Sequence, residues 1–169
     1  YGSNLANIRT TPCSTFKIWN TLIGIENNQI NSENDSFYIW DGITRAYPDW
    51  NKNLNLHEAF QFSCVPAYQI LANKIGQNNM KIWIDKINYG DKDISSGLDI
   101  FWLPRPNKKS IKISPIEQAS LIKKLVNNQL NFSDKSKQIL KKIMLFKRTE
   151  NGTFFGKTDA GQNSEHAPV

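Results

Sequence analysis

The sequence predicts an α+β fold in a single domain, residues 1–169, with a large helical region at about residues 15–146 and antiparallel strands at about residues 147–160. Apolar residues recur at helical spacing along most of the chain, which predicts amphipathic helices. Near the C-terminal end, the pair Asn151-Gly152 is a strong hairpin signal, and Thr153–Thr158 is typical of a strand. At 169 residues the chain is long enough to bury a substantial core.

The first predicted helix runs from Thr15 to about Glu26. Phe16, Trp19 and Leu22 follow each other at helical spacing. Pro12 lies just before the helix, where a proline suits a helix entry, and the pair Asn27-Asn28 ends it. This helix therefore begins close to the chemically interesting residues discussed below.

The middle of the chain alternates loops with short helices. Residues 35–50 and 91–107 are rich in turn residues and are predicted to be loops, the first with short extended pieces and the second a long functional loop. Helices are predicted at Leu56–Phe62, which leads to Ser63, at Pro66–Ile75, which Gly76 ends, and at Asn79–Ile87, which ends near Gly90.

Two later helices have clear start signals. Ser114-Pro115-Ile116-Glu117 is a capping box with proline at the first helical position. Ser133 is expected to cap the next helix. The first of these helices carries Leu121, Ile122, Leu125 and Val126. In the second, the residues expected to face inward are Ile139, Leu140, Ile143 and Met144. Because a single hairpin is marginal alone, we expect the sheet to be incomplete in this chain, with strands missing at both ends.

Composition excludes several classes of protein. Hydrophobic residues make up 39% and charged residues 21%, which is ordinary for a globular chain. No apolar run approaches the roughly 20 residues of a membrane span, and the polar start Tyr1–Arg9 has no signal-peptide pattern. Because the chain does not begin with Met, we expect a processed or trimmed N-terminus, and a membrane anchor outside this chain stays open. The net charge of +6 comes from scattered lysines, which favours a solvated basic surface over a nucleic-acid site.

Cysteines and histidines give no metal-binding pattern. Cys13 and Cys64 are too few for a zinc site, and they form either a single bridge or, as the residues favour, two buried thiols. His57 and His166 are far apart in sequence and are expected on the surface or in loops. We therefore expect no metal.

Ser14 and Lys17 are the first candidate pair for catalysis. Their spacing at the start of a helix places both side chains on one face. A serine hydroxyl becomes a nucleophile when a base takes its proton, and a lysine can do this only when it is neutral. Burial lowers a lysine pKa, and Phe16, Trp19 and Val65 could supply an apolar surrounding.

The pair alone is a weak signal, because Ser120 and Lys123 repeat the spacing within an amphipathic helix, where a structural role is expected. Three further elements strengthen it: Ser63-Cys64-Val65 at a break between helices, Lys157-Thr158 on the late strand, and Tyr89-Gly90-Asp91 before the loop that holds Trp102. Each also has a structural interpretation: Ser63 as a helix cap, Lys157 as an exposed charge, and Tyr89 and Trp102 as core aromatics.

In this order the motifs resemble those of the class D (oxacillinase-type) β-lactamases and the related β-lactam sensor domains. The quoted motifs are Ser14-Thr15-Phe16-Lys17, Ser63-Cys64-Val65, Tyr89-Gly90-Asp91, Phe101-Trp102-Leu103, and the helix entry Ile113-Ser114-Pro115-Ile116-Glu117-Gln118. The resemblance covers nearly the whole chain. It implies a β-lactamase/transpeptidase-like fold and a β-lactam as the small-molecule partner.

The resemblance also implies a mechanism. Ser14 would attack the β-lactam carbonyl, and a carbon dioxide-derived carboxyl group on the Lys17 nitrogen would act as the base for acylation and deacylation, with no other cofactor. Ser63 would pass a proton to the leaving nitrogen. The resemblance further implies that Trp102 hydrogen-bonds the carboxylated lysine and Val65 presses on it, that Lys157 and Thr158 face the substrate carboxylate, and that the backbone N–H groups of Ser14 and Ala160 form the oxyanion hole.

The chain departs from the family pattern in three places. Lys157-Thr158 is followed by Asp159 where the family has glycine, which adds bulk and negative charge beside a carboxylate-binding site. Asp91 replaces an asparagine. The chain ends at Val169, before the arginine-bearing strand that helps to hold the substrate carboxylate in the family.

Three functions remain as alternatives. A hydrolase would release the acyl group, whereas a sensor would keep it and signal; Val65 favours the hydrolase, because the sensors usually depart from Ser-x-Val. A cell-wall transpeptidase is the third, and the context of Trp102 argues against it. The resemblance implies a location outside the cytoplasm, and the oligomeric state stays open.

Overall fold

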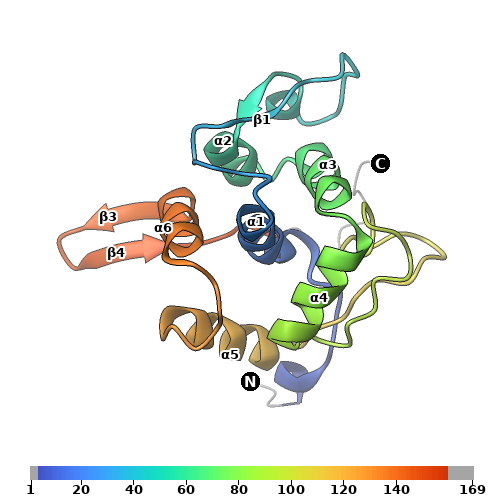
Figure 1. Ribbon diagram of the computed structural model, residues 1–169, viewed down its shortest axis with the longest axis vertical. Helices are drawn as coiled ribbons and strands as arrows, with labels where there is room; N and C mark the ends of the chain where they lie inside the picture. The colour runs from blue at the N-terminus through green and yellow to red at the C-terminus, as the bar shows by residue number, and fades with distance from the viewer. Residues whose placement is uncertain (1–3, 160–169) are drawn as a thin grey trace.

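The computed structural model describes residues 4–159 and has an α+β fold in which helices dominate (Figure 1). In the labels used here, η marks a short 3-10 helix, α an α-helix and β a strand. The elements in chain order are η1 (Leu5–Asn7), η2 (Cys13–Phe16), α1 (Lys17–Glu26), β1 (Ser36–Tyr38), η3 (Pro48–Trp50), β2 (Leu54–Asn55), α2 (Leu56–Gln61), α3 (Val65–Ile75), α4 (Gln77–Ile87), α5 (Pro115–Val126), α6 (Asp134–Ile143), β3 (Leu145–Thr149) and β4 (Gly152–Phe155).

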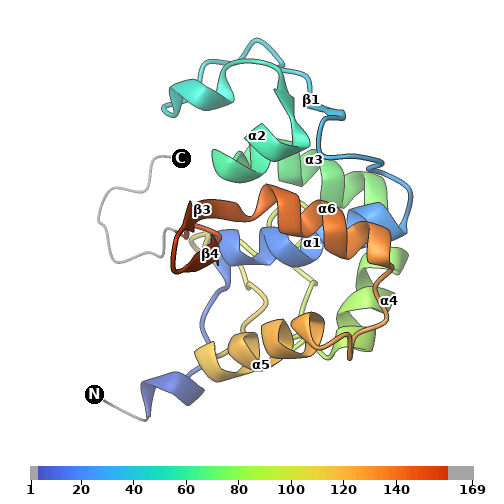
Figure 2. The same ribbon diagram turned by 90° about the vertical axis from the view of Figure 1, so that its left-hand side faces the viewer.

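Helix α1 lies at the centre of the molecule. Figure 1 shows the other helices arranged around it, and Figure 2 shows α6 running alongside it. It also packs against α3. Every residue from Lys17 to Ile25 is buried, so this helix is covered on all sides. A central buried helix fixes the position of the residues at its N-terminal end, which include Ser14 and Lys17.

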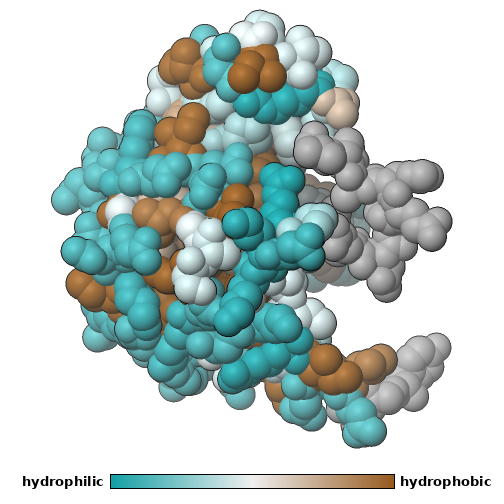
Figure 3. All heavy atoms as spheres, turned by 90° about the vertical axis from the view of Figure 1, so that its right-hand side faces the viewer, coloured by the Kyte–Doolittle hydropathy of each residue, from teal (hydrophilic) through white to brown (hydrophobic). Residues whose placement is uncertain are grey.

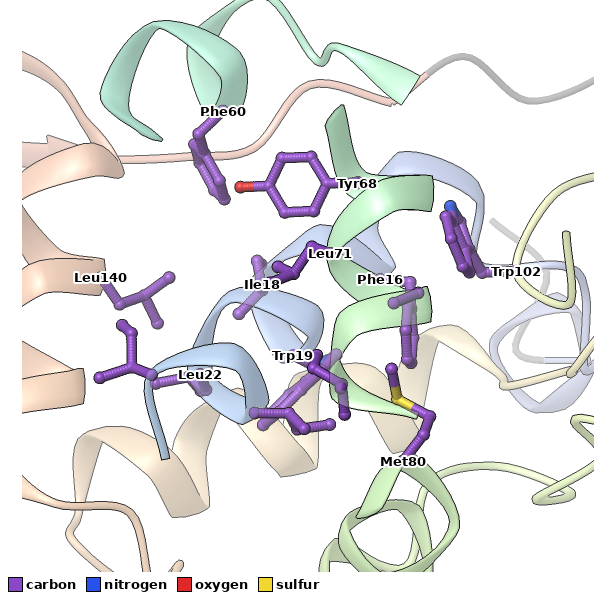
Figure 4. Close-up of a cluster of buried hydrophobic side chains, with 14 of the residues drawn as sticks. Phe16, Ile18, Trp19, Leu22, Phe60, Tyr68, Leu71, Met80, Trp102 and Leu140 are labelled. Atoms are coloured by element: carbon purple, nitrogen blue, oxygen red, sulfur yellow. The ribbon is translucent and has the colours of Figure 1, made fainter. Parts of the chain in front are cut away.

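The core is continuous across the helices. Figure 4 shows Trp19 and Leu22 of α1 close to Leu71 of α3 and Leu140 of α6. Phe16 and Trp102 stack with ring centroids 5.8 Å apart, which ties the long loop after α4 to the start of α1. Fully burying a side chain of this kind stabilises a fold by roughly 1.5–3 kcal/mol.

The predicted helix ends are confirmed where local chemistry sets them. Ser114 and Glu117 form the expected capping box at α5, and the Ser133 hydroxyl accepts a hydrogen bond from the Ser136 amide at α6. Gly76, with a φ of 80°, separates α3 from α4. Helix α4 begins at Gln77, two residues before the predicted start, because this glycine completes the break in a single residue.

The strands form two separate two-stranded antiparallel sheets, β1–β2 and β3–β4. The β3–β4 hairpin has Thr149 opposite Gly152 and Leu145 opposite Phe155. The prediction that the strand reaches Thr158 was wrong, because β3 begins at Leu145 and offers β4 no partner beyond Phe155. Lys157 and Thr158 therefore follow the strand instead of lying on it.

The surface carries several exposed apolar side chains. Figure 3 shows apolar residues on the surface at the top and at the bottom of one face. The exposed large apolar side chains include Leu5, Ile8, Ile39 and Ile43. Val126, at the end of α5, is 73% exposed. It directly follows the buried Leu125, so the helical rotation of about 100° per residue turns it outward. Among residues 4–159, no helix is both long and apolar enough to cross a bilayer.

Candidate active site

Ser14 lies in the tight turn η2, immediately before α1. Cys13, the residue before it, has a φ of 47°, which is the left-handed region that residues other than glycine rarely adopt. Such backbone conformations cost of order 1–3 kcal/mol and cluster at functional sites. The turn leaves Ser14 half-buried at the edge of a cavity of about 480 Å³.

The Ser14 hydroxyl is the meeting point of two other side chains. Lys17 Nζ donates a hydrogen bond to Ser14 Oγ at 2.9 Å, and Ser63 Oγ donates to the same oxygen, also at 2.9 Å. Lys17 is one helical turn away, whereas Ser63 is brought from the loop between α2 and α3. The structure thus brings together three of the predicted residues around one oxygen atom.

Lys17 is completely buried, with no exposed side-chain surface. Its pKa is lowered from 10.5 to about 7, first because burial disfavours the charged form and second because Lys157 is nearby and positive. Phe16 and Trp19 of the expected apolar surrounding are buried, Val65 is partly buried, and the Tyr68 ring centroid lies 5.6 Å from Nζ. A lysine with this pKa is partly neutral at neutral pH and can accept a proton.

Ser63 has the backbone strain expected of a positioned side chain. Its φ is 54°, again in the left-handed region. The N-terminal cap of α3 is Cys64, so the interpretation of Ser63 as a helix cap is wrong. The Ser63 side chain instead reaches Ser14 from the side of the cavity.

Trp102 is buried and its indole N–H has no hydrogen-bond acceptor among the residues that the structure describes. The indoles of Trp40 and Trp50, by contrast, both donate to backbone carbonyls. A buried donor without an acceptor costs about 1–3 kcal/mol. The orphaned indole therefore marks a place where an acceptor would be stabilising.

Lys157, Thr158 and Asp159 lie beyond the end of β4. Lys157 Nζ donates to the carbonyl and to the hydroxyl of Thr158, both at 2.9 Å. Burial lowers the pKa of Lys157 to about 8, against the opposing effect of the Asp159 charge. Thr158 and Asp159 line the cavity. The predicted oxyanion-hole residue Ala160 lies outside the described residues.

Asp159 makes a contact that the sequence did not predict. Its Oδ1 accepts a hydrogen bond from the backbone N–H of Ser14 at 2.7 Å. In the sequence, Asp159 differs from the family pattern only by standing where the family has glycine. Residues 145 positions apart in the chain share no local pattern that could have shown the contact.

The cavity also has two arginines that sequence reasoning did not select, Arg45 and Arg105. Arg45 is paired through two hydrogen bonds with the Asp41 carboxylate. Arg105 is half-buried; its carbonyl accepts a hydrogen bond from the Lys108 amide at 3.3 Å, but its guanidinium makes no hydrogen bond or ion pair with any residue in the range 4–159. The signal that could have found it is a cationic residue just after the Phe101-Trp102-Leu103 run.

The Tyr89-Gly90-Asp91 segment stabilises the long loop. Gly90 has a φ of 52°, and a Cβ there would lie 2.0 Å from the Lys112 carbonyl oxygen. Asp91 Oδ1 accepts a hydrogen bond from the Lys112 amide at 3.0 Å. Asp91 is not among the described residues that line the cavity, so its replacement of asparagine acts on the loop rather than on the cavity wall.

The other candidate residues take structural or surface positions. Ser120 and Lys123 are both exposed on α5, as expected of a structural pair. Cys13 and Cys64 are buried free thiols, which confirms the favoured interpretation, and burial raises the pKa of Cys13 to about 11. His57 is exposed and His166 lies outside the described range. Within residues 4–159, no three His, Cys, Asp or Glu side chains gather into a possible metal site.

A serine hydroxyl that contacts a buried lysine and a second serine beside a cavity is an arrangement that suits a nucleophilic serine. Residues 1–164 match the family described as "Penicillin binding protein transpeptidase domain". The chain is 39% identical over 158 residues to "Probable beta-lactamase YbxI" of Bacillus subtilis (strain 168), which covers 94% of this chain and 57% of that protein.

Two further relatives extend the comparison. The crystal structure of the class D β-lactamase YbXI from Nostoc is 32% identical, with a TM-score of 0.89, and covers 98% of this chain and 68% of that one. "Regulatory protein BlaR1" of Bacillus licheniformis is 30% identical over 94% of this chain and 25% of its own length.

The chain therefore belongs to the penicillin-binding transpeptidase domain family and, within it, to the class D β-lactamases. It spans 57% of the length of the Bacillus subtilis relative. The predicted β-lactamase/transpeptidase-like fold is confirmed.

Proposed function

We propose that the protein hydrolyses β-lactams through an acyl-enzyme on Ser14. The observation that carries this proposal is the position of Ser14 Oγ, 2.9 Å from both Lys17 Nζ and Ser63 Oγ. A general base removes the Ser14 proton, Oγ forms a bond to the lactam carbonyl carbon, and the carbon–nitrogen bond of the ring breaks. Ser63, within reach of Ser14, passes a proton to the leaving nitrogen. Water then releases the acyl group.

We propose that Lys17 carries a carbon dioxide-derived carboxyl group on Nζ. This modification requires a neutral amine, and the lowered pKa of Lys17 supports its presence at neutral pH. The buried Trp102 N–H without an acceptor fits the same group, because a carboxyl oxygen could accept its hydrogen bond. When bound, the group supplies the base for acylation and deacylation. Val65, partly buried beside the site, would help to keep water from it.

Substrate binding is assigned to the residues at the cavity edge. Thr158 lines the cavity and receives two hydrogen bonds from Lys157, so this pair offers a cation and a hydroxyl to a substrate carboxylate. Arg105 provides a second positive charge at the same cavity. The Ser14 amide would polarise the lactam carbonyl. We further propose that the protein acts outside the cytoplasm, where β-lactams meet the cell wall.

A second candidate is a β-lactam sensor, which the motif resemblance left as an alternative; the similarity to a protein named as regulatory, BlaR1, is weak support for it. Its site would be acylated in the same way but would deacylate very slowly. The two candidates differ only in the fate of the acyl group, so turnover separates them.

Turnover of a chromogenic cephalosporin, with and without added bicarbonate, tests the proposal. We expect steady hydrolysis that bicarbonate increases, that Ser14→Ala abolishes and that Ser120→Ala leaves unchanged. Trp102→Phe should require a higher bicarbonate concentration for half-maximal activity, because the carboxyl group loses the hydrogen bond from the indole. A stoichiometric burst without turnover would contradict hydrolysis and support the sensor. Turnover by Lys17→Ala at the parent rate would contradict the role of Lys17.

A further inference from the structure

Asp159 lies directly against the backbone of the proposed nucleophile. Its Oδ1 is 2.7 Å from the Ser14 nitrogen, a short hydrogen bond of the charge-assisted kind. Both residues line the same cavity, and Asp159 itself is exposed. The carboxylate therefore reaches the Ser14 amide from the solvent side, without being enclosed by the core.

The Ser14 amide is also the group that would polarise the substrate carbonyl. A tetrahedral adduct places its anionic oxygen about 2.7–3.1 Å from such a donor. The Asp159 oxygen lies at that distance already and carries a negative charge, so it occupies the donor that the reaction needs. One amide hydrogen cannot serve both oxygens at full strength.

We propose that Asp159 is an intramolecular competitor of the substrate and sets the rate of acylation of Ser14. The protein then has a closed arrangement, with the Asp159 carboxylate on the Ser14 amide, and an open arrangement, with the carboxylate turned to solvent. Only the open arrangement accepts a lactam carbonyl. This inference rests on the proposed acylation of Ser14.

The charge of Asp159 adds a preference among substrates. Arg105 lines the cavity and Lys157 donates a hydrogen bond to the cavity-lining Thr158; the Asp159 charge offsets part of the attraction of these two cations for an anion. The Asp159 carboxylate therefore repels a β-lactam that has a free carboxylate, but not the neutral ester of the same β-lactam. Asp159 acts on the carbonyl of every substrate but repels only the anionic ones.

Two substitutions separate the two effects. Asp159→Asn keeps an acceptor for the Ser14 amide but removes the charge, whereas Asp159→Gly removes both. Loss of a hydrogen bond to a charged group shifts the equilibrium between the closed and the open arrangement by roughly 10- to 100-fold. Because only the open arrangement reacts, the rate of acylation rises by the same factor. Glu150→Gln, at the exposed hairpin turn, is the matched control for the loss of one negative charge.

The test is the rate of covalent labelling by a fluorescent penicillin and by its methyl ester, in the full protein. We expect Asp159→Gly to label about 10- to 100-fold faster with both probes. In Asp159→Asn the labelling rate should increase more with the anionic penicillin than with the ester. Glu150→Gln should be labelled at the parent rate. Labelling of Asp159→Gly at or below the parent rate would overturn the inference and leave the proposed function standing.

Amide hydrogen exchange gives a readout that does not depend on acylation. In Asp159→Gly the Ser14 amide should exchange faster, whereas the Thr15 amide, which donates to the Pro12 carbonyl at 3.1 Å, should be unchanged. Unchanged exchange at Ser14 would overturn the closed arrangement. Faster exchange at Ser14 with no labelling of any variant would overturn both the proposed function and the rate-setting role of Asp159.

Discussion

Lys17→Met should stabilise the protein while it removes the proposed base. Lys17 is fully buried, and its pKa falls from 10.5 to about 7. Since one pH unit corresponds to about 1.36 kcal/mol, burying the charged ammonium costs ~5 kcal/mol at a pH below 7. Methionine has a similar shape without the charge. Relaxation of the protein around Lys17 and loss of the hydrogen bond to Ser14 offset part of this stabilisation. We therefore expect the free energy of unfolding of Lys17→Met to exceed that of the parent by about 2–4 kcal/mol at pH 6.

The gain should shrink as the pH rises. The folded-state pKa of Lys17 is lowered, so between pH 7 and 10.5 the unfolded chain binds more protons than the folded protein. Stability of the parent protein therefore rises with pH through this window, and the cost of burying Lys17 disappears above it. At pH 9 the advantage of Lys17→Met should be less than half of its value at pH 6.

Urea unfolding of both proteins at pH 6 and pH 9, in buffer free of carbon dioxide, measures this difference. The matched control is Lys123→Met, because Lys123 follows Ser120 at the same spacing but is exposed on α5; it should change stability by less than about 0.5 kcal/mol at either pH. A Lys17→Met protein that is no more stable than the parent at pH 6 would refute the reasoning. An advantage that is equal at both pH values would refute it as well.

Three further substitutions test single contacts. Ser63→Ala should slow acylation of Ser14 by about 100-fold, because proton transfer to the leaving nitrogen is lost; stopped-flow labelling measures it, and an unchanged rate would remove Ser63 from the reaction. Gly90→Ala should destabilise by at least ~2 kcal/mol in urea, because its Cβ would lie 2.0 Å from the Lys112 oxygen; a parental midpoint would contradict the placement of this loop. Ser114→Ala should cost about 1 kcal/mol by the same assay, since the Glu117 amide loses its cap, and no loss would contradict that role.

The fold could be predicted from the sequence where short-range signals decide it. Ser114 and Ser133 act on amides within three residues, so their helix starts follow from the sequence alone. The end of β4 could not be predicted in the same way, because Phe155 is the last residue with a partner on β3. Val126 fits a helical pattern but lies just past the edge of the buried face.

In the site, too, contacts between residues that are close in sequence could be predicted, whereas contacts between distant residues could not be predicted from local patterns. Ser14 and Lys17 are one turn apart, so their contact follows from helical spacing. Ser63 was found through its resemblance to a family motif, since its contact with Ser14 spans 49 positions. The left-handed conformations of Cys13 and Ser63 have no sequence signal, because neither residue is a glycine. The Asp159 contact is longer still in sequence and depends on where the chain passes after β4.

The most direct test of the central claim is the mass of the protein, and of its peptides, after mixing with a β-lactam and stopping the reaction at short times. The account predicts one covalent adduct per chain, carried by the peptide that contains Ser14, which forms within the first turnovers and disappears once the β-lactam is consumed. An adduct on exposed Ser120 instead, or hydrolysis that persists in Ser14→Ala, would contradict the assignment of Ser14 as the acylated residue.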